Sequence, residues 1–123
     1  MPTYITLCKL TDQGAQDIKN APKRIRAAGK MLEKMGGKIT GFYLTIGDYD
    51  YIAIGEAPND EVACTFLLGL GATGILKTTT LKAFTLEEFE KIVNEIGLGK
   101  GSFEDFQQVV DIVDYFADNI YNL

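Results

Sequence analysis

Two aspartates near the middle of the chain, Asp48 and Asp50, have the spacing of residues that act together. In an extended segment both carboxylates would point to one side and Tyr49 to the other. Such a pair suits general acid–base catalysis or the binding of a hard metal ion. Aspartate beside glycine is also common in hairpin turns, where its carboxylate bonds nearby backbone N–H groups. The residues favour this structural role and leave the acid–base and metal roles open.

A glycine run and two cysteines also have structural interpretations. Residues 69–74 match the letters of the GxGxxG motif, which binds dinucleotides where it follows a strand and opens a helix. Here the run follows a helical pattern and precedes a strand-like one, so we interpret it as a helix end. Cys8 and Cys64 fall on apolar faces of their predicted elements, and both thiols are expected in the core.

The chain has no histidine, and this excludes several kinds of site. Histidine-ligated metals, Ser-His or Cys-His nucleophiles and imidazole catalysis all need that side chain. Two cysteines are too few for a structural zinc site or a disulfide framework. We therefore expect no metal and no cofactor, and the residues do not decide whether the protein is an enzyme.

The charges are unevenly distributed, with 12 basic and 17 acidic residues and a net charge of -5. All the basic residues lie within 1–100, and the tail beyond has only acidic ones. These are Glu104, Asp105, Asp111, Asp114 and Asp118. Nucleic-acid binding needs a basic face, so no nucleic-acid partner is expected.

One predicted helix nevertheless has a row of basic residues, which we call the basic stripe. It consists of Lys19, Lys23, Arg26, Lys30 and Lys34. We interpret it as a solvated helix face, with an anion site or docking of the acidic tail as alternatives.

Hydropathy gives no sign of a membrane partner. No apolar run approaches the roughly 18 residues that a membrane span needs. The N-terminus lacks the charged start and apolar stretch of a signal peptide. A soluble, cytoplasmic protein is expected.

Hydrophobic periodicity divides the chain into the elements that would position these residues. Runs rich in β-branched, aromatic and apolar residues predict strands at 3–10, 38–46, 51–57 and 74–84. Apolar positions at helical spacing predict helices at 17–35, from about residue 60, at 86–96 and at 103–120. The second and third strands form a hairpin in which Gly47 can take a positive φ. Thr85 and Glu88 have the spacing of a capping box.

The order β-α-β-β-α-β through residue 96 predicts an α+β, ferredoxin-like domain with a four-stranded antiparallel sheet covered by helices on one face. The other face would carry Tyr, Phe and Ile beside Thr. We expect two sheets to pair through it, as in dimeric α/β barrels, making a homo-oligomer, dimer or higher. Residues 97–123 would form a flexible joint and an acidic amphipathic helix that packs on another element of the oligomer.

Several motifs resemble those of the GYD domain family, over about residues 1–96. They are Pro2-Thr3-Tyr4-Ile5-Thr6-Leu7, Thr11-Asp12-Gln13-Gly14, Pro22-Lys23-Arg24, Gly36-Gly37-Lys38, Gly41-Phe42-Tyr43-Leu44-Thr45-Ile46-Gly47-Asp48-Tyr49-Asp50 and Glu56-Ala57-Pro58. The biochemical role of those small bacterial and archaeal proteins is largely unassigned. A more distant likeness joins Thr45 to Asp50, the Ala57-Pro58-Asn59-Asp60 turn and Gly74 with Lys77-Thr78-Thr79-Thr80. The order of these motifs along the chain is similar to that in the effector-binding domain of Lrp/AsnC-type regulators.

This second likeness implies a ligand site near the hairpin of strands 2 and 3, at a subunit interface, where that domain binds amino acids. Two carboxylates of the chain would bind the ammonium group of the amino acid. Backbone near the glycine would bind its carboxylate, and hydroxyl groups would complete the site. The residues so assigned are Tyr43, Gly47, Asp48, Tyr49, Asp50 and Thr78. The chain departs from those regulators in having no helix-turn-helix and a longer first helix.

Three functions remain open at this stage. The preferred one is an oligomeric, effector-type module that binds a small metabolite such as an amino acid at the interface. The alternatives are a cofactor-independent enzyme of the dimeric α/β-barrel type, a monooxygenase or isomerase, and a purely structural oligomer.

Overall fold

A computed structural model of the chain describes residues 1–96 and 103–121, with side chains in the last helix described from 104 to 119. By its internal contacts the chain divides into two units, Met1–Ala83 and Phe84–Leu123. The boundary expected after residue 96 falls within the second unit. The expected joint at 97–102 lies outside the described residues.

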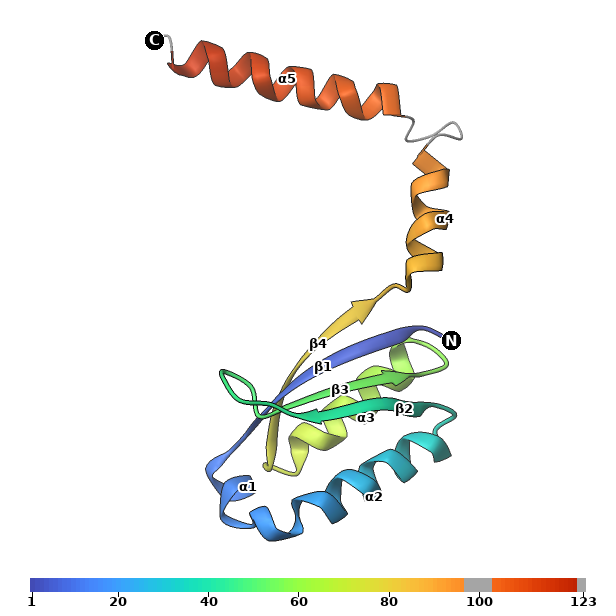
Figure 1. Ribbon diagram of the computed structural model, residues 1–123, viewed down its shortest axis with the longest axis vertical. Coiled ribbons are helices and arrows are strands. Elements are labelled where there is room, and N and C mark those ends of the chain that lie inside the picture. Colours follow the sequence, from blue (N-terminus) through green and yellow to red (C-terminus); the bar gives the residue numbers. More distant parts are fainter. Residues whose placement is uncertain (97–102, 122–123) are drawn as a thin grey trace. The chain divides into compact units, whose positions relative to one another are not determined.

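The first unit is built on a four-stranded antiparallel sheet with the strand order β2-β3-β1-β4 (Figure 1). The strands are β1 (Thr3–Leu10), β2 (Lys38–Leu44), β3 (Tyr51–Glu56) and β4 (Leu76–Ala83). A bulge between Ile39 and Gly41 shifts the register of β2 against β3. The sheet predicted from the sequence is confirmed, and its order and connections are consistent with the ferredoxin-like arrangement.

Helices α2 (Ala21–Lys34) and α3 (Asp60–Ala72) lie on the same side of this sheet (Figure 1). Helix α2 packs against β2 and α3 against β4. A short helix, α1 (Asp12–Gln16), and a 3-10 turn, η1 (Ile18–Asn20), precede α2. Within the stretch 17–35 the regular helix therefore begins at Ala21, as the preference of Pro22 for the first helical turn predicts.

The core of the first unit lies between these helices and the sheet. Its buried apolar side chains are Cys8, Ala21, Leu32, Tyr51, Ala57, Ala63 and Phe66. The Phe42 ring packs against Tyr51 with ring centroids 5.2 Å apart. Many members of this core are small, so it fills limited volume between the layers.

Helix α3 confirms one sequence-based interpretation and contradicts another. Gly74, with φ 76°, follows α3 and leads into β4, so the glycine run is a helix end. Cys64, however, is exposed, whereas Cys8 is buried as predicted. Apolar residues occur around most of α3, and Leu68 is 75% exposed. The apolar positions at helical spacing, such as Ala63 and Phe66, are nevertheless the buried ones, and the error is confined to Cys64 beside them.

The second unit contains α4 (Leu86–Ile96) and α5 (Phe103–Tyr121). The predicted capping box is confirmed: the Glu88 N–H donates to Thr85 Oγ1 at 3.1 Å, and the Thr85 N–H donates to Glu88 Oε1 at 3.0 Å. Helix α5 exposes apolar side chains, among them Phe106 and Val113. What its apolar face packs on stays a prediction. None of the described helices has the length and apolar character needed to cross a membrane.

Candidate functional site

The face of the sheet opposite α2 and α3 is apolar, and nothing in the first unit covers it. We call it the open face. Its apolar side chains are Ile5, Leu7, Tyr43, Ile52, Ile54 and Leu81. Ile5, on the central strand β1, lies between Ile54 of β3 and Leu81 of β4. Leu81 is 52% exposed and Tyr43 61%, so an apolar surface is accessible across all four strands.

Lysines border the open face. Lys9 and Lys77 are cross-strand partners at one end of β1 and β4. At the other end, Lys38 Nζ lies 3.5 Å from the Glu56 carboxylate. Lys9 Nζ lies 5.3 Å from the centroid of the Tyr49 ring. Neither Lys9 nor Lys77 has an ion pair within the described residues, so the face is apolar at its centre and positive at its edge.

The predicted aspartate pair lies in the loop between β2 and β3. The Asp50 carboxylate accepts the Leu10 N–H at 2.8 Å, and the Asp50 N–H donates to the Cys8 carbonyl at 2.8 Å. The Thr45 hydroxyl donates to the Tyr49 carbonyl at 2.6 Å. Asp50 therefore ties the loop to β1, which is a structural role, but through a distant strand and not through the nearby turn backbone that the sequence suggested.

The remaining predicted site residues do not gather at one point of a single chain. Gly47 has the predicted positive φ, 132°, and the Asp48 side chain is exposed. Tyr43 pairs with Ile52 on the open face, whereas Thr78 pairs with Cys8 on the covered one. A ligand site shared between subunits stays a prediction. No group of three acidic or cysteine side chains that could hold a metal occurs within the described residues.

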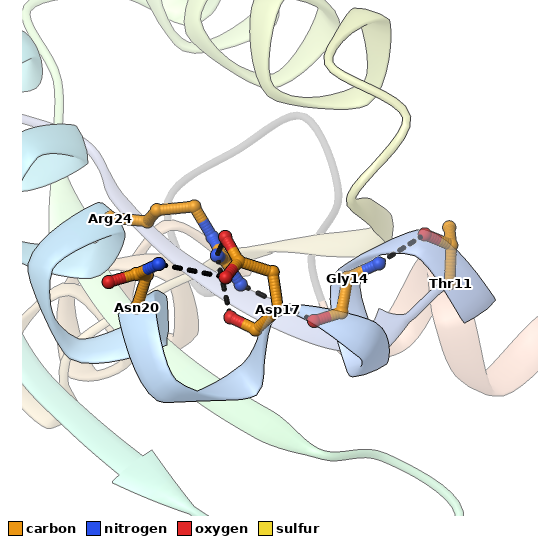
Figure 2. A network of polar contacts seen from close by, with 5 residues as sticks. All are labelled: Thr11, Gly14, Asp17, Asn20 and Arg24. Atoms are coloured by element: carbon orange, nitrogen blue, oxygen red, sulfur yellow. Dashed lines mark hydrogen bonds and ion pairs between the residues drawn. The ribbon is translucent and has the colours of Figure 1, made fainter.

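A polar network before α2 holds Arg24, a residue that the sequence did not single out (Figure 2). Its Nη1 donates to the Asp17 carboxylate at 2.7 Å and to the Asp17 carbonyl at 2.9 Å, and its Nη2 donates to the Gly14 carbonyl at 3.4 Å. Asn20 donates to the same carboxylate, and Thr11 caps α1 by accepting the Gly14 N–H. The basic stripe is exposed, as a solvated face would be, whereas the Arg24 side chain is 26% exposed.

A second polar cluster attaches the start of α3 to the sheet. The Tyr4 hydroxyl donates to Asp60 Oδ1 at 2.5 Å, and Lys82 Nζ lies 3.1 Å from the same oxygen. Burial, and then the hydrogen bond to Asp60, raise the pKa of Tyr4 to about 12. The Tyr4 and Lys82 hydrogen bonds lower the pKa of the Asp60 carboxyl. At neutral pH the Tyr4 hydroxyl thus keeps its proton and the Asp60 carboxyl is charged, which are the forms that these contacts require. The cluster therefore joins α3 to the sheet at that pH.

Comparison with known proteins adds two findings. The model of the GYD domain family matches residues 4–93, which include most of α4 and all of the sheet but Thr3. A Thermus thermophilus protein named glutamine synthetase and cystathionine beta-lyase binding protein is 34% identical over 89 residues, 72% of this chain and 94% of that relative. No solved structure matches the chain significantly.

Proposed function

The chain belongs to the GYD domain family, and on that premise we propose that it is a protein-binding module whose docking surface is the open face. The observation that carries the proposal is an apolar sheet surface that nothing in the first unit covers. Large contiguous apolar surfaces are uncommon on free monomeric proteins and usually mark a site of association. Here the surface extends over all four strands, and so broad a surface suits a protein better than a small molecule.

The charges at the edge of the open face indicate the chemistry of the partner. Lys9 and Lys77 lie at one end without an ion pair in the described residues. A partner with an apolar patch bordered by Asp or Glu would complement both the centre and the edge. The relative is named for binding glutamine synthetase and cystathionine beta-lyase, so these two enzymes are the first partners to test.

Pairing of two copies through the same face, as the sequence predicts, is the competing arrangement. It would bring the unpaired Lys9 and Lys77 of both copies into one interface, where like charges oppose association. An acidic partner avoids that cost. The effector-type site at the hairpin depends on such pairing, so it ranks second for the same reason.

The experiment measures binding of the full chain to purified glutamine synthetase and cystathionine beta-lyase, each from the same organism as the chain, by biolayer interferometry. Leu81→Glu places a charge at the centre of the open face. Leu68→Glu is the matched control, because Leu68 is also exposed but lies on α3, away from that face. Light scattering of each variant gives its oligomeric state.

We expect Leu81→Glu to weaken binding of at least one enzyme about thirtyfold or more, as for a central interface residue. Leu68→Glu should bind like the unmodified chain. Absence of binding to both enzymes, or equal weakening by the two substitutions, contradicts the proposal. A dimer that Leu81→Glu dissociates, with neither enzyme bound, would instead identify the open face as the contact between two copies.

A further inference from the structure

A cavity of about 330 Å³ lies on the other side of the sheet, between the covered face and helices α2 and α3. Its floor on β1 and β3 includes Thr6, Ala53 and Gly55, which are small. Ala27 and Ala28 of α2 contribute to one wall, and apolar side chains of α3 form the opposite one. Because α2 packs over β2 and α3 over β4, the space above the two central strands is left to these short side chains. They do not fill it.

The size and lining of the cavity suit a compact apolar ligand. Its volume is at the lower end of the range of about 300–1,000 Å³ for small-molecule pockets. Ala27 and Met31, which both line it, are exposed, so the cavity reaches the surface beside α2. Apolar space left empty in a protein lowers stability in proportion to its volume, which favours an occupied state.

One polar group that reaches this cavity makes no hydrogen bond to the protein within the described residues. Tyr51 is 5% exposed and lines the cavity from β3, and its hydroxyl makes no hydrogen bond within the described residues. Tyr4 and Thr6 also line the cavity, but their hydroxyls are bonded to Asp60 and Thr80. The Tyr51 hydroxyl is therefore free to bond a ligand atom in the cavity.

Arg24, which is paired with Asp17, also lines the cavity. Asp17 and the Gly14 carbonyl hold its two terminal nitrogens (Figure 2). Its Nε–H has no acceptor among the residues that the structure describes. Burial raises the pKa of Tyr51 and the Arg24 charge opposes that rise, as expected when the two groups are neighbours. Hydroxyl and guanidinium together form a site for an anionic oxygen.

We propose that this cavity binds a compact apolar monocarboxylate, with its hydrocarbon part between α2 and α3 and its carboxylate at the Tyr51 hydroxyl and the Arg24 guanidinium. The Arg24 Nε–H and the Tyr51 hydroxyl can donate to a carboxylate, and the alanine and leucine walls match a hydrocarbon. The cavity and the open face are on opposite sides of the sheet. The ligand site therefore does not rest on the protein-binding proposal, and either can fail alone.

The test titrates the full chain with decanoate, below its micelle concentration, by calorimetry, and repeats the titration with decanol. Ala53→Leu fills the floor of the cavity, and Ala27→Phe places a ring at its mouth from an exposed position that tolerates it. Tyr51→Phe removes only the unpaired hydroxyl. Ala72→Phe, at the exposed end of α3 and outside the lining, is the matched control.

The expected result is one decanoate bound per chain, with affinity lowered about tenfold or more by Ala27→Phe and by Ala53→Leu, and unchanged by Ala72→Phe. Tyr51→Phe should weaken decanoate about tenfold, the usual loss of a hydrogen bond to a charged group, and leave any decanol binding unchanged. Absence of decanoate binding overturns the proposal. So does decanoate binding that neither cavity-filling variant weakens, or decanol binding as tightly as decanoate.

Discussion

The two faces of the sheet belong to the same four strands but have opposite kinds of side chain. On the central strands, the covered face has Thr6 and Ala53, whereas the open face has Ile5, Ile52 and Ile54. A free domain would be expected to place its bulky apolar residues under the helices and its small or polar ones outside. Here, at the middle of the central strands, bulky residues face away from the helices and small ones lie beneath them, between Tyr4 and Tyr51.

This difference indicates that each face suits a binding partner that the chain itself does not provide. Small residues under spaced helices leave room for a molecule, whereas β-branched residues on an uncovered sheet form a broad surface for association. Both proposals depend on the contrast between the faces. Substitutions that compare one face with the other are therefore the most direct tests of this account.

The largest expected effect comes from two neighbours in β2 that point to opposite faces. Phe42 packs on Tyr51 under the helices, and Tyr43 is 61% exposed on the open face. Phe42→Ala should lower the free energy of unfolding by about 3 kcal/mol, because it enlarges an existing cavity. Tyr43→Ala should lower it by less than about 1 kcal/mol. Urea denaturation followed by circular dichroism measures both.

Similar losses for the two variants would contradict the assignment of the faces. A large loss for Tyr43→Ala alone would mean that the open face is buried in the free protein. The variants differ by one position in one strand, so a general effect on β2 cannot produce the difference.

The next effect concerns the two thiols. Burial raises the pKa of Cys8 from 9.0 to about 11, whereas Cys64 is exposed. A shift of that size lowers the thiolate fraction at pH 8 about a hundredfold, so Cys8 should react with Ellman's reagent at least that much more slowly than Cys64. Cys64→Ser and Cys8→Ser variants report each thiol separately.

The same pKa shift predicts how stability changes with pH. The folded chain keeps the Cys8 proton up to about pH 11, and the unfolded chain releases it near pH 9. Stability from this group is thus complete below about pH 9 and falls as the pH rises towards 11. Between pH 7 and pH 10 the free energy of unfolding should fall less for Cys8→Ser than for the unmodified chain, as denaturation at the two pH values measures. An equal fall in the two proteins contradicts the burial of Cys8.

The fold could be predicted from the sequence because its local signals agree with one another. The strand at Thr3–Leu10, the capping box at Thr85 and the positive φ at Gly47 each follow from residue type and spacing. The buried face of α3, with Ala63 and Phe66, also follows from helical spacing, but apolar residues such as Leu68 lie beyond it and obscure where that face ends. Cys64 was misplaced for that reason.

The candidate sites were much less accessible to sequence reasoning. The cavity depends on how far apart α2 and α3 lie, and no local pattern records that distance. A weak signal was present in Ala53 and Gly55, two small residues alternating on one side of a strand, opposite the alanines of α2. Arg24 was not singled out from the sequence, because its contacts with Asp17 and Gly14 arise only when the chain folds back before α2.

A smaller effect tests whether the covered face is underpacked. Ala53→Leu should raise the free energy of unfolding by about 1 kcal/mol, because the added methylenes enter empty apolar space. Cys8→Leu is the control on the same face: Cys8 is buried but does not line the cavity, so overpacking should cost about 1–3 kcal/mol. Thermal and urea unfolding measure both, and a destabilised Ala53→Leu would mean that the covered face is already filled.

The smallest effect is expected on the open face. Leu81→Thr replaces a 52% exposed side chain by another strand-forming residue, so the free energy of unfolding should change by less than about 0.5 kcal/mol. The free energy of unfolding should also be independent of protein concentration, because no second copy of the chain is bound to a free open face. A loss above about 2 kcal/mol that grows on dilution would show that Leu81 is buried against another chain before any partner is added. The open face would then be the sheet-to-sheet contact predicted from the sequence, and an enzyme partner would have to bind elsewhere.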